Sequence, residues 1–446
     1  MKKLLFVLMI FVLAAGSVFA DLASGLFVNA WGRGVFVPVW YDTTLRTFNT
    51  GSGVSWDPNN RPRVDFRVNG ATDFVGFTVH VNSEDTTGGS IASGDNGAQL
   101  WVRPFGNDLL RLTVATHLQN DTLRGRVGTD TGFENFVMGE SMFGLGGDAR
   151  DPLNGNAIFT RFAGGRTGAA SNESNTSTYP WAAGNVFFLS SSPIEGMFIG
   201  LMLQGAFPQM DFREAWRHVQ IGVGYEIPGI GFARVQYVGG FMGRENDPLD
   251  MFNPAHRARF EAAFAFTAIE DLVLDLGIKY WAPVELINRF ISTEVGVVAV
   301  ERFFRGVDIA FGASYRHGDL NVDFMAQVLS IGAHTGARSH RDELTGGADG
   351  AHLVFNVIPS FNLGQHTVGL SAILQSRFAH TNRDGTVDED SAWTRFGVGA
   401  WGRLNLAGGS LRAGITWTPP ARTNLTGPAF NRGFVTIPII LEYAFF

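Results

Sequence analysis

Apolar and polar residues alternate one by one over most of the chain. In residues 63–69 every even position is apolar and every odd position is polar, and in residues 75–82 the apolar positions are the odd ones. The same alternation recurs in residues 110–114, 219–226, 320–324 and 368–372. Because successive side chains of a β-strand point to opposite faces, the pattern predicts strands with one apolar and one polar face.

Short turns and long polar connections separate these strands. The short turns carry the Gly, Asn and Asp residues of tight hairpins and lie at 69–71, 106–108, 228–231, 317–319, 362–364 and 407–409. The longer connections cover about 41–61, 83–96, 118–182, 242–255, 282–303, 332–350, 378–391 and 419–431, with a short exception near 209–211. Short and long connections in alternation place all tight turns at one end of a sheet and all long loops at the other.

The pattern predicts eighteen strands, within a range of 16–20. Their expected spans are 25–40, 62–70, 73–82, 98–105, 109–117, 183–190, 196–206, 213–227, 231–241, 256–267, 271–281, 304–316, 320–331, 351–361, 365–377, 392–404, 410–418 and 432–446. An even number brings both chain ends to the short-turn side. Residues 293–303 also have the composition of a strand, but one more strand would put 332–350 at the short-turn end, so we expect them to be a loop.

The composition of the two faces favours a closed barrel in a membrane over a soluble β-sandwich. The polar faces carry Gly, Thr, Ser, Asn, Gln and Arg, and Lys279 is the one Lys after residue 20. The apolar faces end in aromatic residues, namely Trp40, Tyr225, Tyr237, Phe241, Tyr280, Tyr315, Trp417 and Tyr443. Such residues suit the two interfaces of a bilayer, and in lipid a sheet has to close on itself to pair its backbone. The predicted fold class is therefore all-β, a transmembrane antiparallel β-barrel.

The first twenty residues have the pattern of a secretory signal peptide. Lys2 and Lys3 precede the apolar run 4–15, and Val18 and Ala20 supply small residues for cleavage before Asp21. A membrane anchor is the alternative, but the run is shorter than the roughly 20 residues that a spanning helix needs. We expect residues 1–20 to be removed and residues 21–446 to form a single barrel in an exported protein.

Charge and composition exclude several classes of function. The formal charge is −7, or −9 without Lys2 and Lys3, which makes a nucleic-acid partner a poor fit. The chain has no Cys, so disulfides and thiolate chemistry are excluded. The ten His form no zinc-binding pair, and no motif joins a His such as His117, His334 or His380 to a nucleophile. We therefore expect no metal, no cofactor and no enzymatic activity.

The chain resembles outer-membrane porins. The resemblance rests on the leader at 1–20, on hairpin alternation over nearly all of 25–446 and on a final strand that ends in the aromatic residue Phe446. Counting back from Phe445 in steps of two gives the apolar set Tyr443, Leu441, Ile439 and Ile437, so the outward face is shifted by one residue from Phe446. The resemblance implies that the final strand is read by the barrel-insertion machinery.

A barrel of this size implies a water-filled channel, since 16–18 strands leave an aqueous bore. The resemblance implies passive diffusion of small polar solutes across the outer membrane of a diderm bacterium, contact with its lipid, and an assembly for which a homotrimer and a monomer both stay open. The alternative function is an adhesin or surface receptor whose closed barrel only displays its loops.

The longest connection, 118–182, is a candidate constriction loop. In porins the loop at this position folds into the lumen, and the segment Met142–Asp148 resembles the Phe-Gly-Gly-Asp of general porins. Its candidate constriction residues are Glu134, Glu140, Asp148 and Asp151. A solvated surface loop is the other interpretation.

Alternation also predicts charged residues on the lumen side. The strands at 392–404, 410–418, 432–446, 25–40 and 62–70 become neighbours on closure, and with two further strands they carry Arg33, Arg63, Arg67, Arg103, Arg111, Arg395, Arg403 and Arg412. The opposite wall carries Glu261, Asp275, Asp308 and Asp323. A cationic wall facing acidic groups would filter solutes by charge. We expect Arg33, Arg67 and Arg395 near mid-height, and Arg103, Arg111, Arg403 and Arg412 near the short turns.

Two features of the predicted lumen leave its function open to a second interpretation. Asp65 lies on the basic wall, while Arg257, Arg259, Lys279 and Arg316 lie on the acidic one, so a mixed polar lining is the alternative. Four inward Trp precede an Arg by two residues: Trp31, Trp101, Trp393 and Trp401. They suit either sugar stacking or a structural role in which the ring packs on the guanidinium, and the structural role is favoured.

Overall fold

The computed structural model describes most of the predicted strands and some of the connections. The described residues are 26–48, 63–84, 97–115, 186–204, 219–238, 259–281, 284–287, 300–304, 306–332, 334–335, 347–348, 351–382, 386–420, 422–423 and 433–444. The leader 1–20, the predicted constriction loop 118–182 and the terminal Phe446 lie outside them.

Eighteen long strands of the described residues form one antiparallel sheet. In the first half of the chain they are β1 (Leu26–Asp42), β3 (Arg63–Ala71), β4 (Val75–Glu84), β5 (Gly97–Val102), β6 (Arg111–Ala115), β7 (Val186–Ser191), β8 (Met197–Gln204), β9 (Val219–Ile227) and β10 (Gly231–Val238). In the second half they are β11 (Arg259–Ile269), β12 (Leu272–Trp281), β15 (Val307–His317), β16 (Leu320–Ile331), β19 (His352–Leu363), β20 (His366–Arg377), β23 (Trp393–Leu406), β24 (Gly409–Thr418) and β26 (Phe434–Ala444). Each corresponds to one predicted span.

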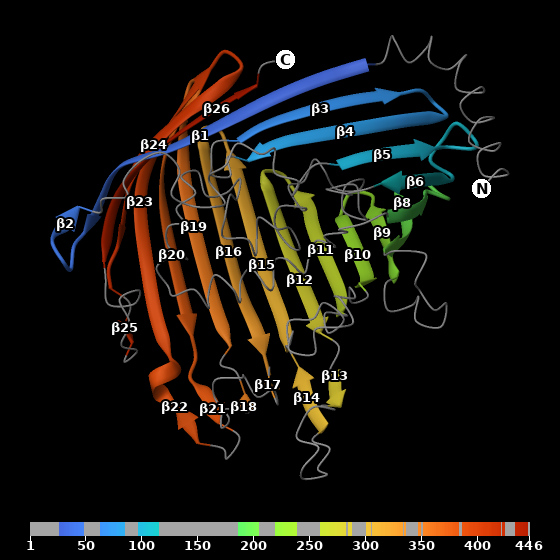
Figure 1. Cartoon of the computed structure of the whole chain (residues 1–446). Coiled ribbons are helices and arrows are strands. Elements are labelled where there is room, and N and C mark those ends of the chain that lie inside the picture. The colour runs from blue at the N-terminus through green and yellow to red at the C-terminus, as the bar shows by residue number, and fades with distance from the viewer. Residues whose placement is uncertain are drawn as a thin grey trace.

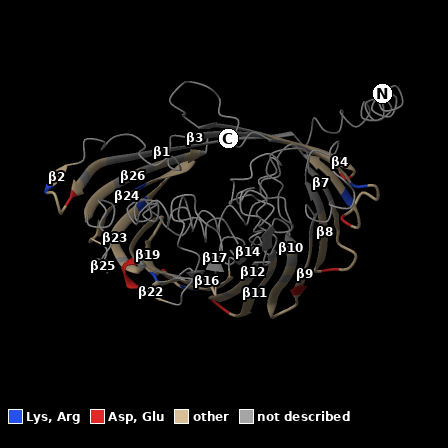
Figure 2. Cartoon of the chain, turned by 60° about the horizontal axis from the view of Figure 1, so that its bottom comes forward, with Lys and Arg blue, Asp and Glu red and all other residues tan. Residues whose placement is uncertain are grey.

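The sheet closes on itself through the first and last strands. Every strand of the set pairs with its neighbours in chain order, and β26 pairs with β1 over residues 434–444, which joins the two ends of the series. Viewed from the long-loop end, the strands form a ring (Figure 2). The fold is therefore a closed antiparallel β-barrel, as predicted, and closure leaves no long unpaired edge in the wall.

The two kinds of connection lie at opposite ends of the barrel. The short turns, such as those between β9 and β10 and between β19 and β20, contain Gly229 and Gly364 with φ of 72° and 63°, a left-handed conformation that glycine adopts without strain. The described segments of the long connections, such as residues 284–287, 300–304 and 380–382, lie at the other end, at the bottom of Figure 1. The predicted separation of short and long connections is confirmed for the described residues.

Short strands extend the wall beyond the barrel at the long-loop end. Six of them form a second antiparallel sheet: β13 (Val284–Ile287), β14 (Val300–Phe304), β17 (His334–Thr335), β18 (Gly347–Ala348), β21 (His380–Asn382) and β22 (Val387–Asp388). Two more, β2 (Thr47–Phe48) and β25 (Arg422–Thr423), pair with β1 and β23. A 3-10 helix spans Glu389–Ser391, and no helix in the described part of the chain has the length and hydropathy to cross a membrane.

The second sheet corrects the expectation that 293–303 is a loop. Residues 300–304 are the strand β14, which pairs with β13 rather than entering the barrel. The parity argument excluded one additional barrel strand, but it could not exclude a pair of strands that runs out and back within one long connection. The same explanation holds for β17 with β18 and for β21 with β22.

The two faces of the wall differ in chemistry. Exposed outward residues of the strands are apolar, for example Leu100, Val235, Leu276, Leu370 and Ile415. The other face of the wall carries buried polar residues, namely Thr113, Ser190, Ser314, Ser410, Thr416 and Thr436. The last strand follows this rule with Leu441 and Tyr443 exposed, so its outward positions are the odd ones, as counted from Phe445.

Exposed aromatic residues gather toward both ends of the barrel. Near the short turns they are Phe74, Phe105, Tyr225, Tyr315, Phe361 and Tyr443, and near the long connections they are Phe48, Phe260, Tyr280, Phe378, Phe396 and Trp417. Pairs such as Phe396 with Trp417, whose ring centroids lie 5.6 Å apart, join neighbouring strands.

A bulge in β1 reverses the predicted face of Trp40. The pairing of β1 with β26 shifts by one residue between Phe36 and Val39, so that Trp40 comes to lie opposite Thr436, a buried position of the inner face. Simple alternation had placed Trp40 on the apolar face, which is wrong because a bulge inserts one residue and exchanges the faces beyond it.

Aromatic rings fill recesses in the inner wall toward the short turns. Phe198 lies opposite Gly224, and a Cβ atom at Gly224 would come within 2.7 Å of the Phe232 ring. Phe232 in turn lies opposite Ala265, and all three side chains (Phe198, Phe232 and Ala265) are buried. Small residues on one strand therefore accommodate large rings from the next, which is how this wall obtains packed contacts without a central core.

Candidate functional site: the inner wall of the barrel

The closed ring brings the predicted basic strands together. β23, β24, β26, β1 and β3 are successive neighbours, as expected from closure. Across them the register forms a line of four charged residues: Glu442 is opposite Arg33, Arg33 is opposite Arg63, and Arg63 is opposite Glu84. Directly opposed residues of an antiparallel pair share a face of the sheet. The register therefore places two Glu and two Arg in one line across the basic wall.

Two acidic residues of this line, Glu84 and Glu442, were missing from the set predicted from the sequence. Both fit the alternation of their strands, but they lie at strand ends, where periodicity is weakest. Only the register shows that each directly faces an Arg.

Arg67 and Arg395 have no acidic partner in the register. Arg67 lies opposite Asn29 and His80, and Arg395 lies opposite Gln375. Arg67 is midway along β3, as expected. Arg395 is the third residue of β23 from its long-loop end, so the expectation of mid-height is wrong for it. The observed strand β23, Trp393–Leu406, nearly coincides with the predicted span 392–404, and Arg395 lies close to the long-loop end in both.

Arg403 and Arg412 face each other directly across β23 and β24, close to the short turn at 407–408. Arg403 is exposed and Arg412 half-buried. Their place near the turn agrees with the expectation for this pair, and Arg103 and Arg111 likewise lie one residue beyond β5 and at the first residue of β6.

The predicted acidic wall is interrupted by basic residues. Lys279 lies opposite both Glu261 and Asp308, so the register places the one Lys of the barrel between two of the four predicted acids. Asp275 lies between Ala265 and Gly312 and has no charged partner in the register. The mixed polar lining, which was the alternative, describes this part of the wall better than an uninterrupted acidic face.

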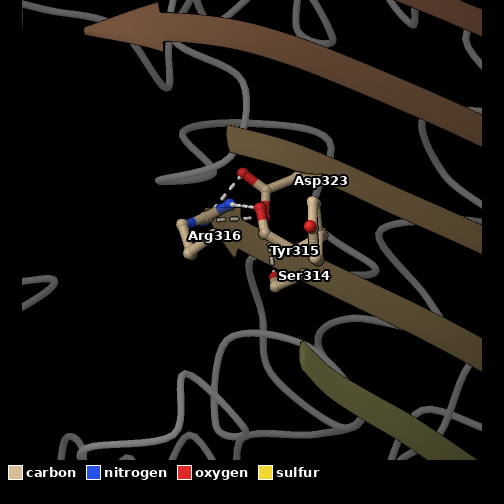
Figure 3. Close-up of polar contacts among 4 residues, drawn as sticks. All are labelled: Ser314, Tyr315, Arg316 and Asp323. Atoms are coloured by element: carbon tan, nitrogen blue, oxygen red, sulfur yellow. Dashed lines mark hydrogen bonds and ion pairs between the residues drawn. The ribbon is translucent and has the colours of Figure 1, made fainter. Parts of the chain in front are cut away.

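Asp323 forms a compact cluster of polar contacts on neighbouring strands (Figure 3). Arg316 Nη2 donates to both carboxylate oxygens, at 2.8 and 3.0 Å, and Ser314 Oγ donates to Oδ1 at 2.7 Å. Arg316 Nη1 also donates to the carbonyl oxygen of Tyr315 at 3.2 Å. The carboxylate of Asp323 is thus locally neutralised, and its role is to join β15 to β16.

Trp101 organises a cationic cluster on the inner face of β5 and β6. The guanidinium carbons of Arg103 and Arg111 lie 4.6 and 4.8 Å from the centroid of the Trp101 ring. Arg103 Nε also lies 3.1 Å from Asp108 Oδ1 in the adjoining turn. The indole is almost fully buried, and a Cβ at the opposite residue Gly76 would come within 2.2 Å of it. The ring is buried in the wall and packs on both guanidinium groups, as the structural role predicted for Trp101 requires.

Trp401 on β23 is likewise seated against a glycine of the neighbouring strand. It lies opposite Gly369, where a Cβ would approach the ring to 2.5 Å, and its Nε1 donates to the carbonyl oxygen of Leu370 at 3.4 Å. Trp393 is also buried. Like Trp101, these two rings are part of the wall.

Some predicted site residues lie outside the described part of the chain. These are the constriction-loop residues Glu134, Glu140, Asp148 and Asp151. Among the described residues, no group of three or more His, Asp or Glu is arranged to hold a metal ion.

Comparison with solved structures finds similar barrels. The anion-selective porin from Comamonas acidovorans is 13% identical, with 94% of this chain and 100% of that chain covered and a TM-score of 0.43. OccAB4 from Acinetobacter baumannii is 8% identical, with 94% and 97% covered and a TM-score of 0.46. A loop-deletion mutant of the outer-membrane protein OmpT of Vibrio cholerae is 10% identical, with 94% and 100% covered and a TM-score of 0.44. No family model and no curated protein matches the sequence.

Proposed function

We propose that this protein is an outer-membrane channel through which small polar solutes diffuse passively. The observation that carries the proposal is the closed ring of eighteen strands with an apolar outer face and a polar inner face. A protein in water rarely exposes a continuous apolar surface of this extent, whereas a bilayer requires one. A ring of this strand number encloses more space than its own side chains fill.

The aromatic residues near both ends of the barrel also support a position across a membrane, with the barrel axis running through the bilayer. Tyr and Trp side chains prefer the interface, where the ring meets hydrocarbon and the polar atom meets water. The short turns would face the periplasm and the long connections the exterior, after export directed by residues 1–20. Residues 21–446 would form the single barrel, with 118–182 narrowing the lumen. Insertion through the C-terminal strand and assembly as a homotrimer belong to the same proposal.

The charges of the inner wall support a selectivity for ion charge. This selectivity would be weaker than that of a fully basic wall facing a fully acidic one. The register places Glu442 opposite Arg33 and Glu84 opposite Arg63, and Arg316 forms an ion pair with Asp323. Arg67 and Arg395 have no acidic partner in the register and Asp275 has no basic one, and these are the residues that we propose bias the passage of ions.

Planar-bilayer recording of the purified, refolded chain tests this function. We expect stable conductance steps and swelling of protein-loaded liposomes in small neutral sugars, with heat-denatured protein as the control. A barrel that refolds, resists extraction from liposomes and yet gives neither current nor swelling would favour the alternative, a surface protein that only displays its loops.

A further inference from the structure

The short turns of the barrel fall into two groups with different chemistry. Between β3 and β10 the turns are 72–74, 103–110, 192–196 and 228–230, and each exposes at least one large apolar side chain. These side chains are 44–60% exposed and belong to Phe74, Phe105, Leu109, Ile194 and Ile230. Between β11 and β24 the turns are 270–271, 318–319, 364–365 and 407–408, which contain only Glu, Asp, Gln, Gly and Ala.

The apolar turns are neighbours on one side of the rim. β3 to β10 pair successively in chain order, so their four turns follow one another without a polar turn between them (Figure 1). We call the five exposed side chains of these turns the apolar arc. The remaining turns continue the rim with polar residues, so the asymmetry divides the rim into two sides.

Backbone hydrogen bonds hold the turns of the apolar arc in place. Each turn is bonded to the next turn or the next strand along the wall. The bonds run from Arg103 N to the carbonyl oxygen of Phe74 (2.6 Å), from Ser192 N to that of Asp108 (2.8 Å), from Glu226 N to that of Gly196 (2.8 Å) and from Thr267 N to that of Ile230 (2.8 Å). The apolar side chains are therefore presented by fixed backbone, and leaving them in water forgoes the free energy of their burial.

The apolar arc is continuous with the outward face of the wall. The ring of Tyr225, an exposed outward residue of β9, lies 3.7 Å from the position of a Cβ at Gly196, in the turn that carries Ile194. The ring of Phe74 lies 3.1 Å from the position of a Cβ at Gly106, in the next turn. Whatever covers the apolar outward face therefore reaches these turns without a polar gap.

We propose that the apolar arc docks into the headgroup layer of the phospholipid leaflet at the short-turn end. Exposed acids stand beside the apolar residues, with Asp73 before Phe74 and Glu195 after Ile194. Apolar and charged groups on one turn suit the boundary between acyl chains and headgroups better than the hydrocarbon itself. The inference rests on the proposed function for the position of the barrel across a bilayer.

The docking has a consequence for how the barrel stands in the membrane. The polar turns between β11 and β24 have no apolar side chain to insert and would stay in water. The leaflet would then cover more of the wall on the side of β3 to β10 than on the other side, and the barrel axis would be inclined to the bilayer normal.

The accessibility of single cysteines to water tests the docking, since the chain has no Cys of its own. Ile194→Cys and Phe105→Cys lie in the apolar arc, and Gln365→Cys is the matched control in an exposed turn of the polar side. The refolded protein is placed in nanodiscs of zwitterionic phosphatidylcholine, where both rims are open to solvent, and treated with an anionic, water-soluble maleimide. We expect both arc variants to react about tenfold more slowly than Gln365→Cys, because a thiol in apolar surroundings forms the reactive thiolate less readily.

Two controls make the outcome decisive. Leu370→Cys, on the outward face of β20, reports whether the barrel lies in the bilayer, and all variants should react at similar rates when unfolded in urea. If Leu370→Cys is protected while both arc variants react as fast as Gln365→Cys, the arc lies in water and is free for a soluble partner, which overturns the docking alone. If Leu370→Cys also reacts as fast, the barrel is not in the bilayer, and the docking and the proposed function are both overturned. Phe105→Cys keeps the test valid if Ile194→Cys does not refold.

Discussion

At the scale of single residues, the contact between Trp101 and Gly76 shows how the inner wall is packed. A Cβ at Gly76 would lie 2.2 Å from the indole, which is far inside van der Waals contact. We expect Gly76→Ala to lower the free energy of unfolding by about 1–3 kcal/mol, because the buried ring has no free volume into which it can shift. Urea unfolding in detergent micelles, followed by intrinsic fluorescence, measures the change.

Two variants separate this clash from a general effect of replacing glycine. Gly402→Ala is the control, since the heavy atom nearest to the new Cβ, the carbonyl oxygen of Thr367, lies 3.9 Å away. The second variant combines Gly76→Ala with Trp101→Ala. Without the indole there is no clash, so we expect the double variant to be almost as stable as Trp101→Ala alone. A single variant Gly76→Ala as stable as the wild type would mean that the ring is not seated against the glycine.

The candidate site could be predicted residue by residue only in part. Alternation correctly assigned Arg33, Arg63 and Arg67 to one group of neighbouring strands, because a period of two and ring closure suffice for that. It could not reveal that Glu84 and Glu442 face Arg63 and Arg33, since partners across strands depend on the register. Register is set by turns and bulges, whose lengths the sequence pattern defines only to within a residue or two.

At the scale of a strand, β20 offers a direct test of which face meets lipid. Leu370 is 58% exposed on the outer face, and the next residue, Ser371, lies on the inner face. We expect Leu370→Arg to destabilise the barrel in phospholipid vesicles by about 2–4 kcal/mol, because the charge would enter hydrocarbon. Unfolding of the vesicle-inserted protein in guanidinium chloride measures the difference.

Ser371→Arg is the matched control for this strand. It adds the same charge one residue away, where the side chain would face the lumen, so we expect a smaller loss of stability and a shift of the current toward anions. Equal destabilisation by the two variants would contradict the assignment of the faces.

Whole strands were the level at which the sequence was most informative. All eighteen predicted spans correspond to barrel strands, because alternation and the spacing of turn residues together mark each strand. The errors came from local irregularities. The bulge between Phe36 and Val39 reversed the face of Trp40, and β14 was hidden within a long connection because it pairs outside the barrel.

At the scale of the whole molecule, a channel requires that the barrel be closed, and closure depends on the pairing of the first strand, β1, with the last, β26. Gly34 and Leu441 are direct partners across this seam, although 406 residues lie between them in sequence. Opposed residues of an antiparallel pair have Cα atoms about 4.5–5.5 Å apart, a distance that a disulfide can span. The chain has no Cys of its own, so a pair introduced here can react only with itself within one molecule.

We expect Gly34→Cys combined with Leu441→Cys to form a disulfide in the refolded barrel. The product would be a nearly circular chain that migrates differently from the reduced chain in a denaturing gel. The control pairs Gly34→Cys with Leu411→Cys, which lies opposite Leu441 on the next strand and therefore about 10 Å from Gly34. If the control formed the disulfide as readily, or the seam pair did not form it in folded protein, the ends would not be joined. An open sheet could not span a bilayer or enclose a pore.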